Sequence, residues 1–304
     1  MRIIEKAVGS SDGKNTLKGK VYLPDGESAG LFQVVHGMTE HIGRYDRFMR
    51  DMCDLGWTVF GYDHLGHGTT AASDADLGFI AHKDGWKLLV SDVGVFADAV
   101  ADEYGKELPR VLFGHSMGSF IVRLYAAKEG EKLSKLIVSG TGGPNPAAGA
   151  GIAVANVIRA FRGERHVSKT LYKLAFGSYN KKWPDEGATA WISNDKSVIE
   201  KYEADRFCTF KFTVSAMADL VKLNKYSSAK STFRGTPKVL PVLLISGEDD
   251  PVGGYGAGVR QVCEAYKREG INVTMKLFPG ARHEVLNDFT YDEAKKIIAD
   301  FAAE

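Results

Sequence analysis

The stretch Arg110-Val-Leu-Phe-Gly-His-Ser-Met-Gly-Ser-Phe-Ile-Val122 decides the fold of this 304-residue chain. It passes from a short apolar run, through the five residues 114–118 with the pattern Gly-x-Ser-x-Gly, into a segment with helical character. Between a strand and a helix, this pattern is typical of a tight turn that exposes the serine side chain. The two glycines remove Cβ atoms that would collide in such a turn. The pattern predicts that Ser116 is a nucleophile, and that the backbone N–H of Met117 faces a developing oxyanion at a helix N-terminus.

Short apolar runs alternate with helical stretches on both sides of this turn, at residues 31–35, 58–62, 110–114, 136–139, 239–246 and 273–278. This rhythm predicts βαβ units and an α/β fold, with a mostly parallel central sheet and helices on both faces. Residues 1–23 predict an antiparallel hairpin at one edge of the sheet.

The strand–helix rhythm stops at Gly140 and resumes after Gly235. Residues 141–234 contain helical segments and no confident buried strand. We therefore predict a core formed by residues 1–140 and 235–304, with residues 141–234 inserted as a helical cap.

A serine hydroxyl needs a neighbouring base, because it is a weak nucleophile alone. On this type of fold the nucleophile, the acid and the histidine follow one another in that order along the chain. Only two histidines follow Ser116. His166 lies among charged residues of the predicted cap, whereas His283 follows a predicted strand, so His283 is the expected base.

The acid is expected in the loop after the strand at 239–246, which contains the adjacent residues Asp249 and Asp250. Asp250 is favoured because Pro251 restricts the residue before it to extended geometry. A second oxyanion donor is expected in the loop after the strand at 31–35, and we assign it to Met38.

The composition narrows the class of protein. With 39 basic and 38 acidic residues, the chain lacks the charge excess of a dedicated nucleic-acid binder. Its three cysteines are far apart and are expected to be buried thiols rather than disulfides or zinc ligands. No apolar leader and no stretch of 18 uncharged apolar residues is visible, so we expect a soluble cytoplasmic protein.

Two further motifs carry a family resemblance. His36-Gly-Met-Thr-Glu-His-Ile-Gly-Arg-Tyr45 and Asp63-His-Leu-Gly-His-Gly68 resemble motifs of the monoglyceride lipases and bacterial lysophospholipases, which are of the serine aminopeptidase S33 type. The turn at 114–118, Asp250 and His283 fit the same family. The resemblance implies an α/β-hydrolase fold and hydrolysis of monoacylglycerols, lysophospholipids or related carboxylic esters without a cofactor.

The resemblance also implies roles for individual residues. Met38 and Met117 would be the oxyanion donors. Glu40, His41 and Arg44 would brace the oxyanion loop rather than react. The acidic and histidine residues of the second motif (Asp63, His64 and His67) are expected to form a structural loop rather than a metal site.

The predicted cap is expected to shape substrate access. Residues 147–158 are nearly uncharged and precede Arg159, Arg162 and Arg165. Such a helix would form an acyl channel or make transient contact with a lipid surface, or would simply pack on the core. The aromatic residues Trp191, Phe210 and Phe212 are expected to line a substrate pocket, or alternatively to belong to the cap core.

Other functions fit parts of the pattern. A peptidase of the proline-aminopeptidase type would need an acidic anchor for the substrate amine, which Asp185, Glu186 or Glu203 could supply. A small-ester carboxylesterase, an acyltransferase and a non-enzymatic binding module are further alternatives on this fold. Ser116 argues against the chemistries that use aspartate as nucleophile.

Overall fold

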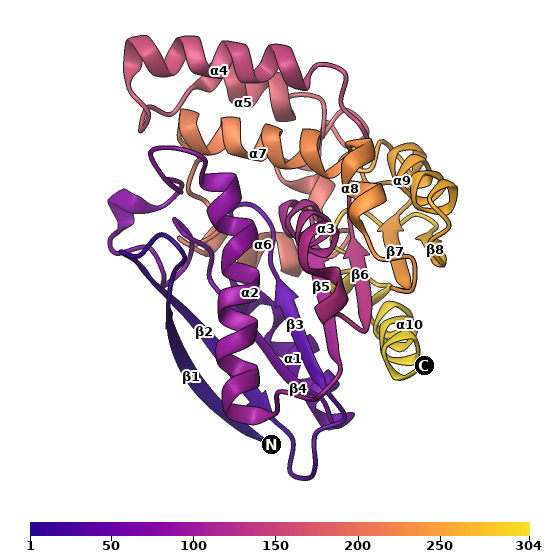
Figure 1. Ribbon diagram of the computed structural model, residues 1–304. Helices are drawn as coiled ribbons and strands as arrows, with labels where there is room; N and C mark the ends of the chain where they lie inside the picture. The colour runs from indigo at the N-terminus through magenta and orange to yellow at the C-terminus, as the bar shows by residue number, and fades with distance from the viewer.

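A single eight-stranded sheet forms the centre of the molecule, which a computed structural model describes over residues 1–304 (Figure 1). Its strand order is β1-β2-β4-β3-β5-β6-β7-β8. The strands are β1 (Arg2–Gly9), β2 (Thr16–Leu23), β3 (Leu31–Val35), β4 (Thr58–Tyr62), β5 (Arg110–His115), β6 (Lys135–Ser139), β7 (Val242–Gly247) and β8 (Val273–Phe278). Strand β2 runs antiparallel to β1 and β4, and every other neighbouring pair is parallel. The predicted mostly parallel sheet with an N-terminal hairpin is confirmed.

Helices cover both faces of this sheet, as predicted. They are α1 (Asp46–Asp54), α2 (Gly85–Tyr104), α3 (Met117–Glu129), α9 (Ala257–Arg268) and α10 (Tyr291–Ala303). Successive strand residues point to opposite faces. Phe113 therefore belongs to the hydrophobic cluster that includes residues of α1 and α10, while Leu112 belongs to the cluster that includes residues of α2, α3 and α9.

The sheet reverses its direction of growth at β3, which lies between β4 and β5. In open α/β sheets such a switch point leaves a crevice at the carboxyl ends of the two central strands. The loop after β3 begins at His36, and Ser116 follows β5 directly. The topology therefore brings the two predicted oxyanion donors, Met38 and Met117, to one crevice.

Five α-helices and no strand lie between β6 and β7: α4 (Ala148–Arg162), α5 (Lys169–Phe176), α6 (Lys196–Ala204), α7 (Val214–Ser227) and α8 (Lys230–Gly235). Three of them begin at a side chain that accepts a backbone N–H, namely Ser168, Asp195 and Thr213. Helix α7 packs between α4 and the core helices α2 and α3 (Figure 1). Helix α4 is consequently the outermost layer of this region.

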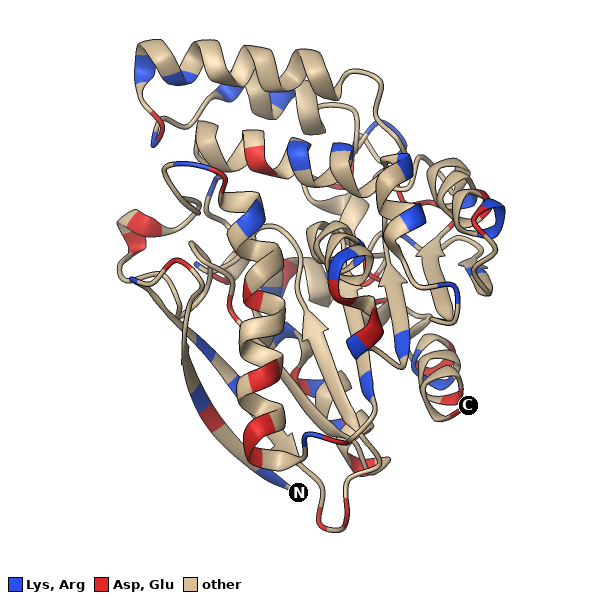
Figure 2. Ribbon diagram, in the orientation of Figure 1, with Lys and Arg blue, Asp and Glu red and all other residues tan.

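Charges of both signs are interspersed over the core elements, in keeping with the balanced composition (Figure 2). Helix α4 differs, because it carries Arg159 and Arg162 and no acidic residue. The three cysteines, Cys53, Cys208 and Cys263, are free and buried, as predicted. None of the helices combines the length and apolar character needed to cross a membrane.

Candidate active site

Ser116 occupies a strained turn between β5 and α3, with φ 53° and ψ −119°. Such a left-handed backbone is costly for a residue with a Cβ. The neighbouring backbone leaves no room for a side chain at either flanking glycine. A Cβ on Gly114 would lie 2.5 Å from the carbonyl oxygen of Gly118, and one on Gly118 would lie 2.2 Å from that of Val35. The backbone is thus packed so tightly that the serine side chain projects from the end of the strand.

The predicted base and acid lie together on the loops after β8 and β7. Nδ1 of His283 lies 2.9 Å from Oδ2 of Asp250, and both side chains are buried. An ionised carboxylate only accepts hydrogen bonds, so Nδ1 donates and Nε2 is left as the basic nitrogen. Asp250 also accepts the N–H of Val252 at 2.8 Å. The neighbouring Asp249 pairs instead with Lys182, so the structure brings Asp250 and not Asp249 to the histidine.

The charge of Asp250 sets the protonation of His283. Burial by itself would lower the pKa of this histidine, but the negative charge and hydrogen bond of Asp250 outweigh burial, and the pKa is raised above its usual value. Glu284 and Glu40 act in the same direction as Asp250. The site therefore stabilises an imidazolium, which is the form that a base adopts after taking a proton from serine.

Two rings that sequence reasoning had not paired with the base lie against it. The ring centroids of Trp191 and His115 lie 5.0 and 4.6 Å from that of His283. The N–H of His283 also donates to the carbonyl oxygen of Trp191 at 3.3 Å. Burial and the nearby His283 hold the pKa of His115 well below its usual value, so this ring is neutral. Its position inside the Gly-x-Ser-x-Gly motif was the available signal.

The loop after β3, which is the predicted oxyanion loop, passes directly beside Ser116. A Cβ on Gly37 would lie 2.9 Å from Cβ of Ser116. The N–H of Gly37 is bonded to the carboxylate of Glu40, so the next donor along the loop is the N–H of Met38. Met38 and Met117 both line the cavity that contains Ser116. The role of Met38 and Met117 as oxyanion donors stays a prediction from the sequence.

Asp63 fixes the base of this loop through hydrogen bonds alone. Its carboxylate accepts the N–H of Ile42 at 2.8 Å, the N–H of Thr69 at 2.7 Å and the hydroxyl of Thr69 at 2.9 Å. With its acceptor positions used in this way, Asp63 ties the loop after β3 to the loop after β4.

Three histidines pack together in tilted and edge-on contacts and are fully buried: His36, His64 and His67. The His36 and His64 ring centroids lie 4.2 Å apart, and Nε2 of His64 donates to the carbonyl oxygen of His36 at 3.1 Å. Burial lowers the pKa of His64 to about 3 and that of His67 to about 4. These rings are therefore neutral packing elements over the physiological pH range.

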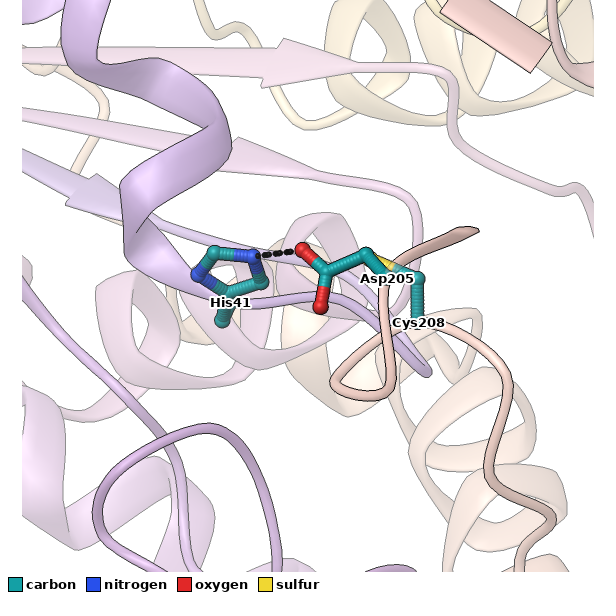
Figure 3. Close-up of side chains that lie close together, drawn as sticks. All are labelled: His41, Asp205 and Cys208. Atoms are coloured by element: carbon teal, nitrogen blue, oxygen red, sulfur yellow. Dashed lines mark hydrogen bonds and ion pairs between the residues drawn. The ribbon is translucent and has the colours of Figure 1, made fainter. Parts of the chain in front are cut away.

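A second cluster of potential metal donors joins the loop after β3 to residues 141–234, the predicted cap (Figure 3). Donor atoms of His41, Asp205 and Cys208 all lie within 4.8 Å of one another. Nε2 of His41 is already bonded to Asp205 at 2.8 Å, and the other carboxylate oxygen accepts the N–H of Phe207. Burial raises the pKa of Cys208, which remains a thiol. As it stands, the cluster is a hydrogen-bonded link between the loop and the cap.

A cavity of about 840 Å³ lies between the core and the cap and contains Ser116 and His283 in its wall. Trp191 and Phe210 also line it. Phe212 does not, because it is fully buried and packs its ring 5.3 Å from that of His67. Further wall residues had no assigned role, although several recur at helical spacing on and just after α5: Tyr172, Ala175, Phe176 and Tyr179.

Comparisons with known proteins point to one family. The sequence profile of the family described as "Serine aminopeptidase, S33" matches residues 26–290. The chain is 29% identical to the monoacylglycerol lipase of Mycolicibacterium smegmatis, over 92% of this chain and 89% of that protein. It is 28% identical to human monoglyceride lipase, over 87% of this chain and 78% of that protein.

A solved structure agrees with these sequence matches. The crystal structure of a thermostable carboxyl esterase from Bacillus coagulans, in complex with glycerol, superposes with a TM-score of 0.93 at 30% identity, over 99% of this chain and 98% of that chain. The profile match extends across strands β3 to β8 and the whole cap. The chain therefore belongs to the serine aminopeptidase S33 family of α/β-hydrolases, and within it is similar to esterases and monoacylglycerol lipases.

Proposed function

We propose that this protein is a serine hydrolase that cleaves monoacylglycerols or lysophospholipid-like lipids through an acyl-enzyme on Ser116. The observation that carries the proposal is the buried Asp250–His283 pair, 2.9 Å long, in the same cavity as the strained Ser116. No cofactor is needed for this chemistry, because the residues supply the nucleophile, the base and the oxyanion donors.

The proposed reaction has two steps. Nε2 of His283 takes the hydroxyl proton while Oγ of Ser116 attacks the ester carbonyl carbon, and the N–H groups of Met38 and Met117 stabilise the oxyanion. The imidazolium, held by Asp250, then protonates the departing alcohol. In the second step His283 takes a proton from water, the hydroxide attacks the acyl carbon, and Ser116 leaves with the proton returned to it.

The size and the lining of the cavity support the proposal that an acyl chain is the larger part of the substrate. Its volume of about 840 Å³ lies near the upper end of the roughly 300–1,000 Å³ that ligand pockets usually span. Aromatic and aliphatic side chains from the cap form much of its wall, including Tyr172, Phe176 and Leu220. A glycerol ester as the substrate is supported by the names of the Mycolicibacterium and human relatives and by the glycerol in the Bacillus structure.

We further propose that the cap makes transient contact with a lipid surface through α4. Val154, Val157 and Phe161 fall on one face of this helix and are 40%, 57% and 85% exposed. Leu174 of α5 adds a fourth exposed apolar side chain. A helix with exposed apolar residues, arginines and no acidic residue is suited to an anionic interface.

Replacing Ser116 by Ala tests the proposal directly. We expect the Ser116→Ala variant to fold, to lose labelling by a fluorophosphonate probe and to lose about 10⁴- to 10⁶-fold in kcat on p-nitrophenyl esters. Wild-type protein should also release acid from a panel of monoacylglycerols and lysophospholipids of increasing chain length. Retention of wild-type activity by the variant would rule out Ser116 as the nucleophile.

The same panel separates the peptidase alternative. Glu203 lines the cavity, so a carboxylate is available to anchor a substrate amine. Turnover of aminoacyl naphthylamides faster than acyl glycerols, with loss in a Glu203→Gln variant, would favour a peptidase. Transfer of the acyl group to added glycerol in preference to water would favour an acyltransferase.

A further inference from the structure

The residue after the base, Glu284, connects it to the oxyanion loop. Its carboxylate accepts hydrogen bonds from both terminal nitrogens of Arg44. Nη2 donates to Oε2 at 2.7 Å, and Nη1 donates to Oε1. Nη1 of Arg44 also donates to Glu40 at 3.0 Å. Glu40 in turn accepts the N–H of Gly37. A continuous chain of hydrogen bonds thus runs from the histidine loop to the residue before Met38.

This series of hydrogen bonds is buried and joins charged side chains, which makes the arrangement rigid. The side chains of Glu284, Arg44 and Glu40 are 7%, 11% and 3% exposed. A bidentate guanidinium–carboxylate pair fixes orientation as well as distance. Tyr45 donates its hydroxyl to Glu40 at 2.9 Å, and Asn287 donates to Glu284 at 3.0 Å. Most acceptor positions of both carboxylates are therefore occupied by protein donors.

The backbone of Glu284 is fixed as well. Its N–H donates to the carbonyl oxygen of Ile192 in the cap at 2.9 Å, next to the bond from His283 to Trp191. Glu284 can therefore move little without displacing His283. A change at position 284 should be felt on one side by the imidazole and on the other side by the oxyanion loop.

We propose that Glu284 is a positioning residue that holds His283 and the oxyanion loop in one register through Arg44. This inference rests on the proposed acyl transfer, in which the base and the oxyanion donors must face the same carbonyl carbon. Misplacement of a reacting group by about 1 Å can cost roughly 10²-fold in rate. Glu284 acts through Arg44 and His283 and contacts no reacting atom.

Replacing Glu284 by Gln keeps its size and removes its charge. We expect kcat on p-nitrophenyl butyrate to fall about 10-fold or more, while KM changes by less than about threefold. The same factor is expected for monobutyrin, because positioning affects every ester alike. A loss confined to monobutyrin would show that Glu284 contacts the glycerol group, and would overturn the proposal.

A conservative change on the other side of the pair provides a second test. Arg44→Lys keeps the positive charge but lacks the planar fork. If the two residues act as one unit, the Arg44→Lys/Glu284→Gln double variant should lose no more activity than the worse single variant. Additive losses would contradict the proposal. Asp92→Asn is a matched control, because Asp92 of α2 is fully buried but bonds to Ser10 and Ser11 in the loop between β1 and β2.

Amide hydrogen exchange tests the coupling without any substrate. Glu284→Gln should speed exchange at residues 37–41, on a different loop, whereas Asp92→Asn should not. Unchanged exchange at 37–41 would overturn the proposal whatever the enzyme's substrate is. Failure of fluorophosphonate labelling in wild-type protein, with coupled exchange intact, would instead overturn the proposed acyl transfer alone.

Discussion

His283 shows how single residues set the chemistry of this site. Burial alone favours a neutral imidazole with a low pKa, and the ionised Asp250 beside it reverses that preference. Asp249, one residue away in the same turn, faces Lys182 and does not contribute. Two adjacent carboxylates therefore have different roles because only one is desolvated against the imidazole.

The raised pKa of His283 predicts the acid limb of the activity profile. A general base must be neutral, so kcat/KM should fall as the pH drops through a value above the ordinary 6.5. Asp250→Asn removes the charge that raises this pKa and the acceptor that fixes the tautomer. We expect a loss of about 10⁴-fold in kcat and a limb displaced to lower pH.

The pH dependence of kcat/KM between pH 4 and 9 measures both effects. Asp249→Asn is the matched control and should leave the limb and the rate near wild type. A limb that stays in place in Asp250→Asn would show that another group titrates.

At the scale of elements, two short segments of the predicted cap hold the two loops that we propose to be catalytic. Residues 190–193 bind the histidine loop, where the buried Arg282 donates to the carbonyl oxygens of Ala190 and Ser193 at 2.7 and 3.2 Å. On the other side, Tyr202 bonds to Thr39 at 3.0 Å and Asp205 to His41 at 2.8 Å (Figure 3). These segments are therefore part of the active-site framework, while α4 lies outside it.

Helix α4 offers a test of the proposed lipid contact at the same scale. Burying a phenylalanine side chain is worth about 1.5–3 kcal/mol, so Val157→Ser/Phe161→Ser should weaken binding to anionic vesicles by about 10-fold or more. Hydrolysis of a soluble short-chain ester should be unchanged, because α4 does not carry the catalytic loops.

Vesicle co-sedimentation checks this expectation. Val239→Ser is the control, since Val239 is an 83% exposed apolar residue that lies just before β7, outside the predicted cap. Equal binding by wild type and the α4 variant would exclude this helix as the contact surface. Binding that is insensitive to salt would exclude a role for Arg159 and Arg162.

On the scale of the whole molecule, the sheet topology gathers loops that are distant in sequence. The reversal at β3 places the loops after β3 and β5 at one crevice, and the loops after β7 and β8 add Asp250 and His283. The same crevice is underlain by the three buried neutral histidines. Their burial supports the oxyanion loop but makes the fold sensitive to acid.

The buried histidines predict the direction of the pH dependence of stability. His64 and His67 have pKa values of about 3 and about 4 in the fold, below the ordinary 6.5 of an unfolded chain. Between those values the unfolded chain binds more protons, so the free energy of unfolding falls as the pH drops from about 6.5 to 4. Each such proton contributes about 1.4 kcal/mol per pH unit.

Urea unfolding at pH 7, 6, 5 and 4.5 measures this slope. His67→Gln should reduce the slope by about one proton. His283 has the opposite sign, because its raised pKa adds stability as the pH falls. A flat profile between pH 6.5 and 4.5 would contradict the assignment of buried neutral rings.

The sequence by itself determined the elements and their order, because these depend on local patterns. Strand β4 at 58–62 and the helix after Ser116 follow from apolar periodicity and from glycines that only a tight turn requires. The choice of Asp250 and His283 used the order of nucleophile, acid and histidine that this type of fold imposes.

Only the tertiary structure decided which side chains meet. The sequence left Asp249 beside Asp250 as an alternative and grouped Phe212 with Phe210, whereas packing turned Asp249 to the surface and Phe212 into the core. The Glu284–Arg44 pair joins residues 240 positions apart. Such contacts depend on how the cap and the sheet pack in three dimensions, which no local periodicity records, so the link between Ser116, His283 and the oxyanion loop appears only in the folded chain.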